Sequence, residues 1–137
     1  MLIQDLAALT GRAQFMALRK RLREQQMKVH VEMAQVLEAS RVAGSPITLV
    51  RHLPMSGGEH QGSWRLRWRI KAGGLHRHAT WDDLQSALGL LPGAVRRHYV
   101  SMNRRVDELN VLDRLLQGSL NRCEGFLGLG GESDPSD

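Results

Sequence analysis

The stretch WRLRWRIK, residues 64–71, alternates strictly between apolar and cationic side chains. Trp64, Leu66, Trp68 and Ile70 hold the apolar positions, and basic residues hold those between them. Because successive side chains of a β-strand point to opposite faces, this pattern predicts a strand with one apolar face and one wholly cationic face. The apolar face must be covered by other elements, so we expect a mixed α+β fold in which helices pack on a small sheet.

Two shorter segments with strand character flank this stretch. ITLVRHL (47–53) is β-branched and precedes a loop, PMSGGEHQGS (54–63), whereas LHRHATW (75–81) alternates again after the tight connection AGG (72–74). Together they predict a three-stranded antiparallel meander. The pattern leaves the register of the last strand open, and the register decides whether Arg77 joins the cationic face or lies among the apolar residues.

A long helical pattern precedes the meander. After a short opening turn, LIQDLAAL (2–9), Thr10 and Gly11 punctuate the chain, and we expect a helix to about Val42, ended by the Gly, Ser and Pro at 44–46. Gln25 or Gln26 interrupts its apolar seam. That seam consists of Phe15, Leu18, Leu22, Val29, Met33 and Val36.

A second long helix is expected after the meander. TWDDLQSAL (80–88) predicts a short helix capped by Thr80, and Pro92 is well placed to start a longer one. The seam of this last helix is predicted at Val95, Tyr99, Met102, Val106, Leu109, Leu112, Leu116, Leu120, Cys123 and Leu127. The economical arrangement is one domain, residues 1–127, in which two long antiparallel helices form a helical hairpin with the three-stranded β-meander inserted between them at its tip, followed by a flexible acidic tail at 128–137.

The composition favours an anionic partner. The 137 residues include 19 Lys and Arg against 14 Asp and Glu, for a formal net charge of +5, and most of the cations are arginines, whose planar fork suits phosphate. Codon bias in GC-rich genomes is the alternative explanation for this arginine content. The single cysteine excludes an intramolecular disulfide, no secretory leader is recognisable, and the apolar runs are far too short to span a bilayer. We therefore expect a cytoplasmic protein without a membrane partner.

Cations side by side on one strand repel each other, and neutral polar residues would be equally soluble, so their presence favours a binding role. The candidate nucleic-acid contacts are Arg65, Arg67, Arg69, Lys71 and Arg77 in the sheet, with Arg96, Arg97, Arg104 and Arg105 near the start of the last helix. We expect the last four to lie close to the sheet in the hairpin arrangement. The three tryptophans are assigned to core packing rather than base stacking, and Asn103 and Asn110 to fixing helix register.

Other chemistry is poorly supported. Six histidines invite a metal hypothesis, and HRH at 76–78 places two on one strand face, but metal sites need three or four converging ligands. The pair Asp82 and Asp83 is interpreted as helix-start electrostatics. No phosphate-binding glycine loop with its lysine and no nucleophile signature is present. We expect no enzymatic activity, no metal and no cofactor.

The segments SWRLRWR (63–69), HATW (78–81) and LPGAVRRHYVSMNRRVDELN (91–110), followed by a leucine-rich helix, are similar to a family of small proteins from integrative and conjugative elements of proteobacteria, sometimes labelled integrase regulator R. The layout also resembles small proteins found beside transposases. The resemblance covers roughly residues 45–127. It implies a DNA-associated role in the transfer or excision of a mobile element, and it implies no specific site residues.

The sequence therefore predicts a non-enzymatic nucleic-acid-binding accessory or regulatory protein of a mobile genetic element. DNA is favoured over RNA, while strandedness and sequence specificity are left open. A homodimer through the helix seams is compatible with this role. The alternative is a protein–protein interaction module, a coiled-coil dimer or adaptor whose basic face meets an acidic partner. An inhibitor or antitoxin-like cap for another protein is a third possibility.

Overall fold

The computed structural model describes residues 11–53 and 62–129. The predicted opening turn, most of the predicted loop at 54–63 and nearly all of the acidic tail lie outside the described residues. The elements in chain order are α2 (Arg12–Ala39), β1 (Ile47–His52), β2 (Arg65–Ala72), β3 (Leu75–Ala79), α3 (Gln85–Gly89) and α4 (Gly93–Leu127). The fold is thus α+β, with a three-stranded antiparallel sheet between two long helices in the chain.

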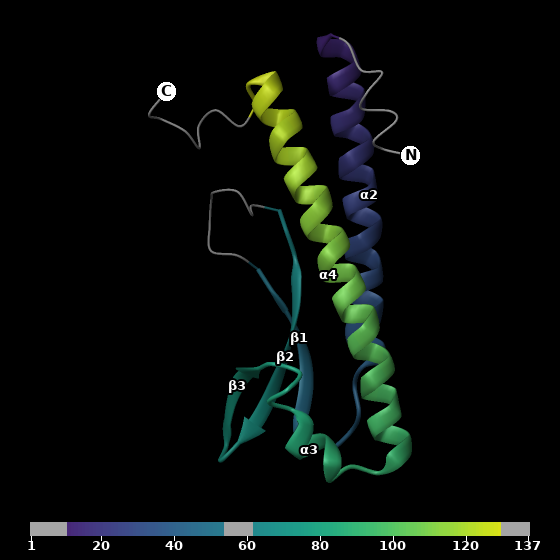
Figure 1. Cartoon of the computed structure of the whole chain (residues 1–137), viewed down its shortest axis with the longest axis vertical. Coiled ribbons are helices and arrows are strands. Elements are labelled where there is room, and N and C mark those ends of the chain that lie inside the picture. The colour runs from purple at the N-terminus through teal and green to yellow at the C-terminus, as the bar shows by residue number, and fades with distance from the viewer. Residues whose placement is uncertain (1–10, 54–61, 130–137) are drawn as a thin grey trace.

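The two long helices lie side by side along the molecule (Figure 1). Contacts at their far ends show that they run in opposite directions, because Arg12 of α2 donates a hydrogen bond to the carbonyl of Leu127, the last residue of α4, at 2.9 Å. The sheet lies against the flank of one half of this pair, so the expectation of a meander at the tip of the hairpin is wrong. None of the described helices is long and apolar enough to cross a membrane.

Both helix ends near the sheet have local causes. α2 ends at Ala39, before the predicted Val42, where the buried Ser40 takes over as cap and its hydroxyl donates to the Leu37 carbonyl at 2.8 Å. Before α3, Thr80 and Asp83 form a reciprocal capping pair: the Thr80 amide donates to the Asp83 carboxylate, and the Asp83 amide donates to the Thr80 hydroxyl. The predicted helix cap at Thr80 is wrong, because this pair closes the turn at 81–84, whereas the N-cap of α3 is Leu84, which forms no side-chain cap hydrogen bond. Hydrogen bonding from Thr80, together with the positive charge of Arg77, holds the pKa of Asp83 below its ordinary value.

The strand register follows from a two-residue turn. Gly73 and Gly74 have φ of 58° and 82°, the left-handed values that a tight type I′ hairpin requires at both central positions. This turn pairs Ala72 with Leu75, and the ladder then runs Lys71 with His76, Ile70 with Arg77 and Arg69 with His78. On the other side of β2, β1 pairs Thr48 with Arg69, Val50 with Arg67 and His52 with Arg65. The predicted antiparallel meander is confirmed, in the order β1-β2-β3.

The core has two apolar parts. The larger lies between the sheet and the helices and includes Leu49, Leu66 and Trp68 from the sheet with Met33 and Tyr99 from the helices. The smaller holds the far ends of the helices together and consists of Leu18, Leu22, Leu120, Cys123 and Leu127, with Phe15 and Leu116 beside it.

A buried polar layer separates the two parts. Gln26, Asp113 and Gln117 occupy seam positions and are buried, so Gln26 is the residue that interrupts the α2 seam. Leu112, which the apolar pattern places in the seam, is 43 % exposed. The α4 seam is therefore displaced by one residue at this point, and hydrogen bonding decides its position.

Candidate nucleic-acid interface

We define the cationic face as the side chains of Arg65, Arg67, Arg69 and Lys71 on β2, with His52 on β1 and His76 and His78 on β3. The pairing register places all of them on one side of the sheet. The alternating residues Leu66 and Trp68 are buried against the helices, so the cationic face points away from α2 and α4. The prediction that one strand carries an apolar face and a cationic face is confirmed.

Within residues 11–53 and 62–129, none of the four β2 cations forms an ion pair with a carboxylate. Neighbours two residues apart on a strand are separated by roughly 7 Å, which is shorter than the screening length of about 8 Å at physiological ionic strength. Their mutual repulsion is therefore only partly screened. The Nε of Arg69 is in addition buried without a hydrogen-bond partner among these residues. An anion on this face would relieve the repulsion, and it would satisfy Nε as well once the Arg69 side chain turned outward to meet it.

Two histidines extend the cationic face across the sheet. His78 lies directly opposite Arg69, and its ring meets that of His52 edge to face, with 5.8 Å between the ring centroids. Loss of surrounding water and then the positive charges of Arg67, Arg69 and His52 lower the pKa of His78. The same positive field that would attract an anion therefore discourages His78 from binding a proton.

Arg77 does not belong to the cationic face. It pairs with Ile70, so its side chain lies on the side of the sheet that carries the apolar residues, where it is exposed. The two-residue turn fixes this outcome, because a register shifted by one residue would have reversed every side chain of β3. Placing Arg77 with the other sheet cations is wrong.

The helix cations do not join the cationic face either. α4 packs on the apolar side of the sheet, so its arginines lie on the side of the sheet opposite the cationic face. Arg105 forms ion pairs with Glu32 of α2 and Glu108 of its own helix, which removes it from the pool of unpaired cations. Arg96, Arg97 and Arg104 are exposed and form no ion pair with a described residue. The expectation of one continuous patch is therefore wrong, and Arg97 and Arg104 form a separate surface seven residues apart on α4.

The tryptophans and the two asparagines hold the sheet to α4. Trp68 is 5 % exposed and its indole N–H donates to the Asn103 side chain at 2.9 Å, so the core assignment of Trp68 is confirmed. Asn110 accepts from the Leu66 amide and donates to the Leu66 carbonyl, at 2.9 Å and 3.0 Å. β3 ends opposite Trp68, and Asn110 thus satisfies strand groups that no third strand reaches. These asparagines join α4 to β2, whereas the sequence pattern assigned them to helix register.

The most buried charged group lies elsewhere, at Asp113. Its carboxylate accepts hydrogen bonds from His30 at 2.6 Å, Ser63 at 2.7 Å, the Trp64 amide at 2.9 Å and Gln26 at 3.3 Å. Burial raises the pKa of Asp113, but the bonds from His30, Ser63 and Trp64 outweigh burial and leave the pKa below its ordinary value. Ser63 donates to the carboxylate and not to the histidine, so the group is a structural anchor and lacks the geometry of a nucleophilic triad.

The Trp64 indole next to this anchor carries two further groups. The His30 ring stacks on it with 4.0 Å between centroids, and the guanidinium of Arg51 lies 4.2 Å from the indole centroid. Arg51 is paired with Leu66 in the sheet and therefore belongs to the side opposite the cationic face.

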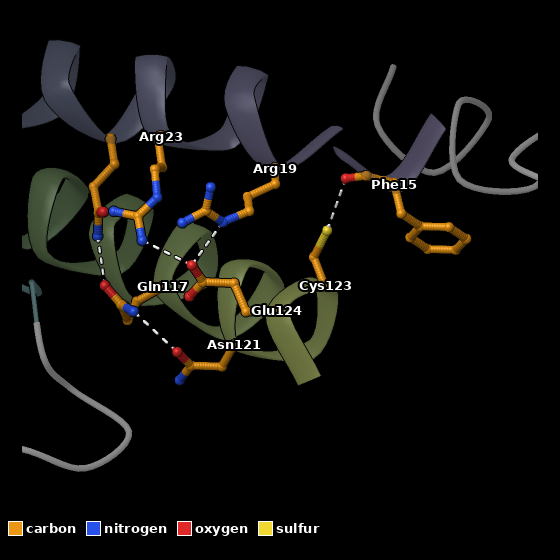
Figure 2. Close-up of polar contacts among 8 residues, drawn as sticks. Phe15, Arg19, Arg23, Gln117, Asn121, Cys123 and Glu124 are labelled. Atoms are coloured by element: carbon orange, nitrogen blue, oxygen red, sulfur yellow. Dashed lines mark hydrogen bonds and ion pairs between the residues drawn. The ribbon is translucent and has the colours of Figure 1, made fainter. Parts of the chain in front are cut away.

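The basic segment of α2 is partly neutralised by α4. Arg19 and Arg23 both donate to one carboxylate oxygen of Glu124, at 2.8 Å and 2.7 Å (Figure 2). In the same region Gln117 links Gln26 to Asn121, and the Cys123 thiol donates to the Phe15 carbonyl. These cations hold the helices together, which leaves the sheet as the place where unpaired cations are most concentrated.

Sequence reasoning missed His52, His78 and Asp113. The signal for His78 was the pair of glycines at 73 and 74, since a two-residue turn sets the register and places His78 opposite Arg69. The signal for Asp113 was Gln26, a polar residue in the facing seam that needs a polar partner when buried. In comparisons with protein-family models, curated proteins and solved structures, the chain gave no match.

Proposed function

We propose that the protein is a non-enzymatic nucleic-acid-binding accessory protein and that the cationic face is its contact surface. The observation that carries this proposal is the row of Arg65, Arg67, Arg69 and Lys71, which no carboxylate of the described residues neutralises. A phosphate backbone supplies evenly spaced negative charges, relieves the repulsion within the row and releases counterions on binding. Contacts of this kind position a nucleic acid but carry little sequence information, so we expect weak sequence preference.

The role in a mobile genetic element, and DNA as the favoured nucleic acid, are part of the same proposal. They depend on the similarity of SWRLRWR, HATW and the arginine-rich helix to the family of conjugative-element proteins described above. Binding in the cytoplasm as a monomer or as a dimer through exposed helix surfaces is compatible with this role.

The test compares two variants that lose the same charge from different surfaces. In the first, Arg65, Arg67 and Arg69 are replaced with Ser; in the matched control, Arg97, Arg104 and Arg122 of α4 are replaced with Ser. Affinity for labelled single-stranded and duplex DNA and RNA is measured by fluorescence anisotropy over a range of salt concentrations. We expect the sheet variant to lose about tenfold or more in affinity at low salt and to lower the salt slope by about 0.9 for each duplex phosphate contact removed.

The control variant should retain most of the affinity. Equal losses in the two variants would show that net charge alone governs binding and would remove the sheet from the account. Circular dichroism and thermal unfolding establish that both variants are folded, which we expect because the replaced side chains form no described ion pair.

One observation favours the alternative function, a protein-interaction module. Val111, Leu112 and Leu115 are 58 %, 43 % and 63 % exposed on neighbouring turns of α4. An apolar group of this kind is typical of contact surfaces. Wild-type binding to DNA no tighter than that of an unrelated protein of equal net charge, together with a dimeric mass by light scattering, would favour this module over the nucleic-acid proposal.

A further inference from the structure

The centre of the cationic face contains two histidines among its arginines, and attraction of an anion by permanent charge alone would not require them. His78 lies between arginine neighbours, directly across from Arg69 and diagonally from Arg67. The His52 ring approaches the His78 ring from β1, at the 5.8 Å centroid separation. Lys71 and His76 form the next pair toward the turn, and Arg65 is paired with His52. These seven side chains are the titratable and charged groups of the described residues on this face.

We propose that Arg67, Arg69, His52 and His78 form one oxyanion-binding subsite that seats a phosphate group of the bound polyanion, with the histidines binding it in their protonated form. This inference rests on the proposed function, because it assigns the place on the cationic face where a phosphate is held most closely.

The arginines supply the permanent charge of this subsite. The buried Arg69 Nε has no acceptor among the described residues, and an unsatisfied donor of a charged group is costly. An arginine binds an oxyanion best through two parallel N–H groups, one of which is often Nε. Because Nε is buried in the unbound conformation, a phosphate reaches it only when the Arg69 side chain turns outward, and that phosphate then gives Nε the acceptor that the unbound protein does not provide.

The histidines make the binding sensitive to pH. In the unbound protein, loss of surrounding water and the charges of Arg67, Arg69 and His52 keep the pKa of His78 below its ordinary value of 6.5. A bound phosphate dianion or diester reverses the sign of the local field and raises the pKa, so binding must take up a proton when the pH lies between the unbound and bound pKa values. By linkage, affinity rises as the pH falls through this interval, by up to about tenfold for each unit of pKa change.

The experiment measures the affinity of the full chain for the labelled DNA probes at constant ionic strength, from about pH 8 to about pH 5.5. We expect wild-type binding to be insensitive to pH above about pH 7.5 and to tighten several-fold below about pH 6.5. The double variant His52→Gln/His78→Gln should lose most of the tightening, measured at each pH relative to its own affinity at high pH. His76→Gln is the matched control, because it removes a histidine from the same face but from outside the subsite.

A second readout is the titration of the histidine ring protons by NMR, with and without DNA. We expect the pKa of His78 to rise on binding. Salt-dependent binding that does not change with pH, or pH dependence that survives in the double variant, overturns the subsite and leaves the proposed function intact. Equal loss of pH dependence in His76→Gln also overturns it, since the effect would then belong to the whole face. Absence of binding at every pH overturns both proposals.

Discussion

Asp113 shows how much of this fold depends on a single side chain. Its two oxygens accept hydrogen bonds from α2 and from Ser63 and Trp64 in the segment before β2, so one carboxylate joins these two parts of the chain to α4. The side chain is 0 % exposed, and the four groups that surround it are donors. The side chain at position 113 must therefore carry a hydrogen-bond acceptor on each of its two terminal atoms.

We therefore predict that Asp113→Asn destabilises the protein by about 3 kcal/mol, because the amide NH₂ faces donors and the partly buried His30 loses its carboxylate. Urea unfolding followed by tryptophan fluorescence measures the change. The control is Asp107→Asn, an exposed residue on the same helix, for which we expect a change within about 0.5 kcal/mol. A loss of less than about 1 kcal/mol in Asp113→Asn would show that the network is readily replaced.

At the residue scale, side-chain pattern identified what faces the core but not which polar residues are buried. Leu112 and Asp113 are adjacent, and hydropathy favours the leucine as the seam residue. The helix instead turns Asp113 inward because His30, Ser63 and Gln26 offer it partners from other elements. Partners that lie 50 or more residues away in the sequence cannot be inferred from local periodicity.

At the scale of elements, α2 and α4 are joined at their far ends by Glu124. Burial raises the pKa of Glu124, but hydrogen bonds from Arg19 and Arg23 outweigh burial and lower it below its ordinary value of 4.5. A carboxyl group with a lowered pKa in the folded state contributes stability above the unfolded pKa and loses it as the pH falls through the folded pKa. The contribution is modest, because the Arg19 and Arg23 side chains are 29 % and 51 % exposed to solvent.

We predict that Glu124→Gln lowers the free energy of unfolding by about 0.5 to 1 kcal/mol at about pH 7. The difference from wild type should shrink as the pH falls below 4.5 and disappear once Glu124 is protonated. Denaturant unfolding at several pH values measures it, with Glu24→Gln, an exposed carboxylate on α2, as the control. A difference that stays constant down to about pH 3 would mean that charge is not what joins the helices.

The elements themselves were predictable from the chain, whereas their contacts were not. Strict alternation at 64–71, the glycine pair at 73–74 and the three-and-four spacing of the helices each act over a few residues, and the meander and both helices appear where these patterns place them. The role of Asn110 escaped the same reasoning. It depends on β3 ending opposite Trp68, which leaves the backbone groups of Leu66 for a side chain of α4 to satisfy.

At the scale of the whole molecule, the sequence identified the segments rich in cations but not the fact that they lie on different surfaces. Nine cations were expected to converge, and the sheet brings together Arg65, Arg67, Arg69 and Lys71 alone. The sheet and α4 pack through their apolar sides, so residues on their outer sides necessarily point in different directions. A compact core therefore separates charged groups that lie close in the linear sequence.

The position of Cys123 has a consequence for following the motions of this protein. The thiol is 4 % exposed within the smaller apolar cluster, and burial and the neighbouring Glu124 raise its pKa, which keeps the reactive thiolate scarce. A thiol-specific reagent can reach it efficiently only when the far ends of α2 and α4 part. Because the chain contains one cysteine, the rate at which a reagent modifies it measures how often the helix ends separate, and no label has to be introduced.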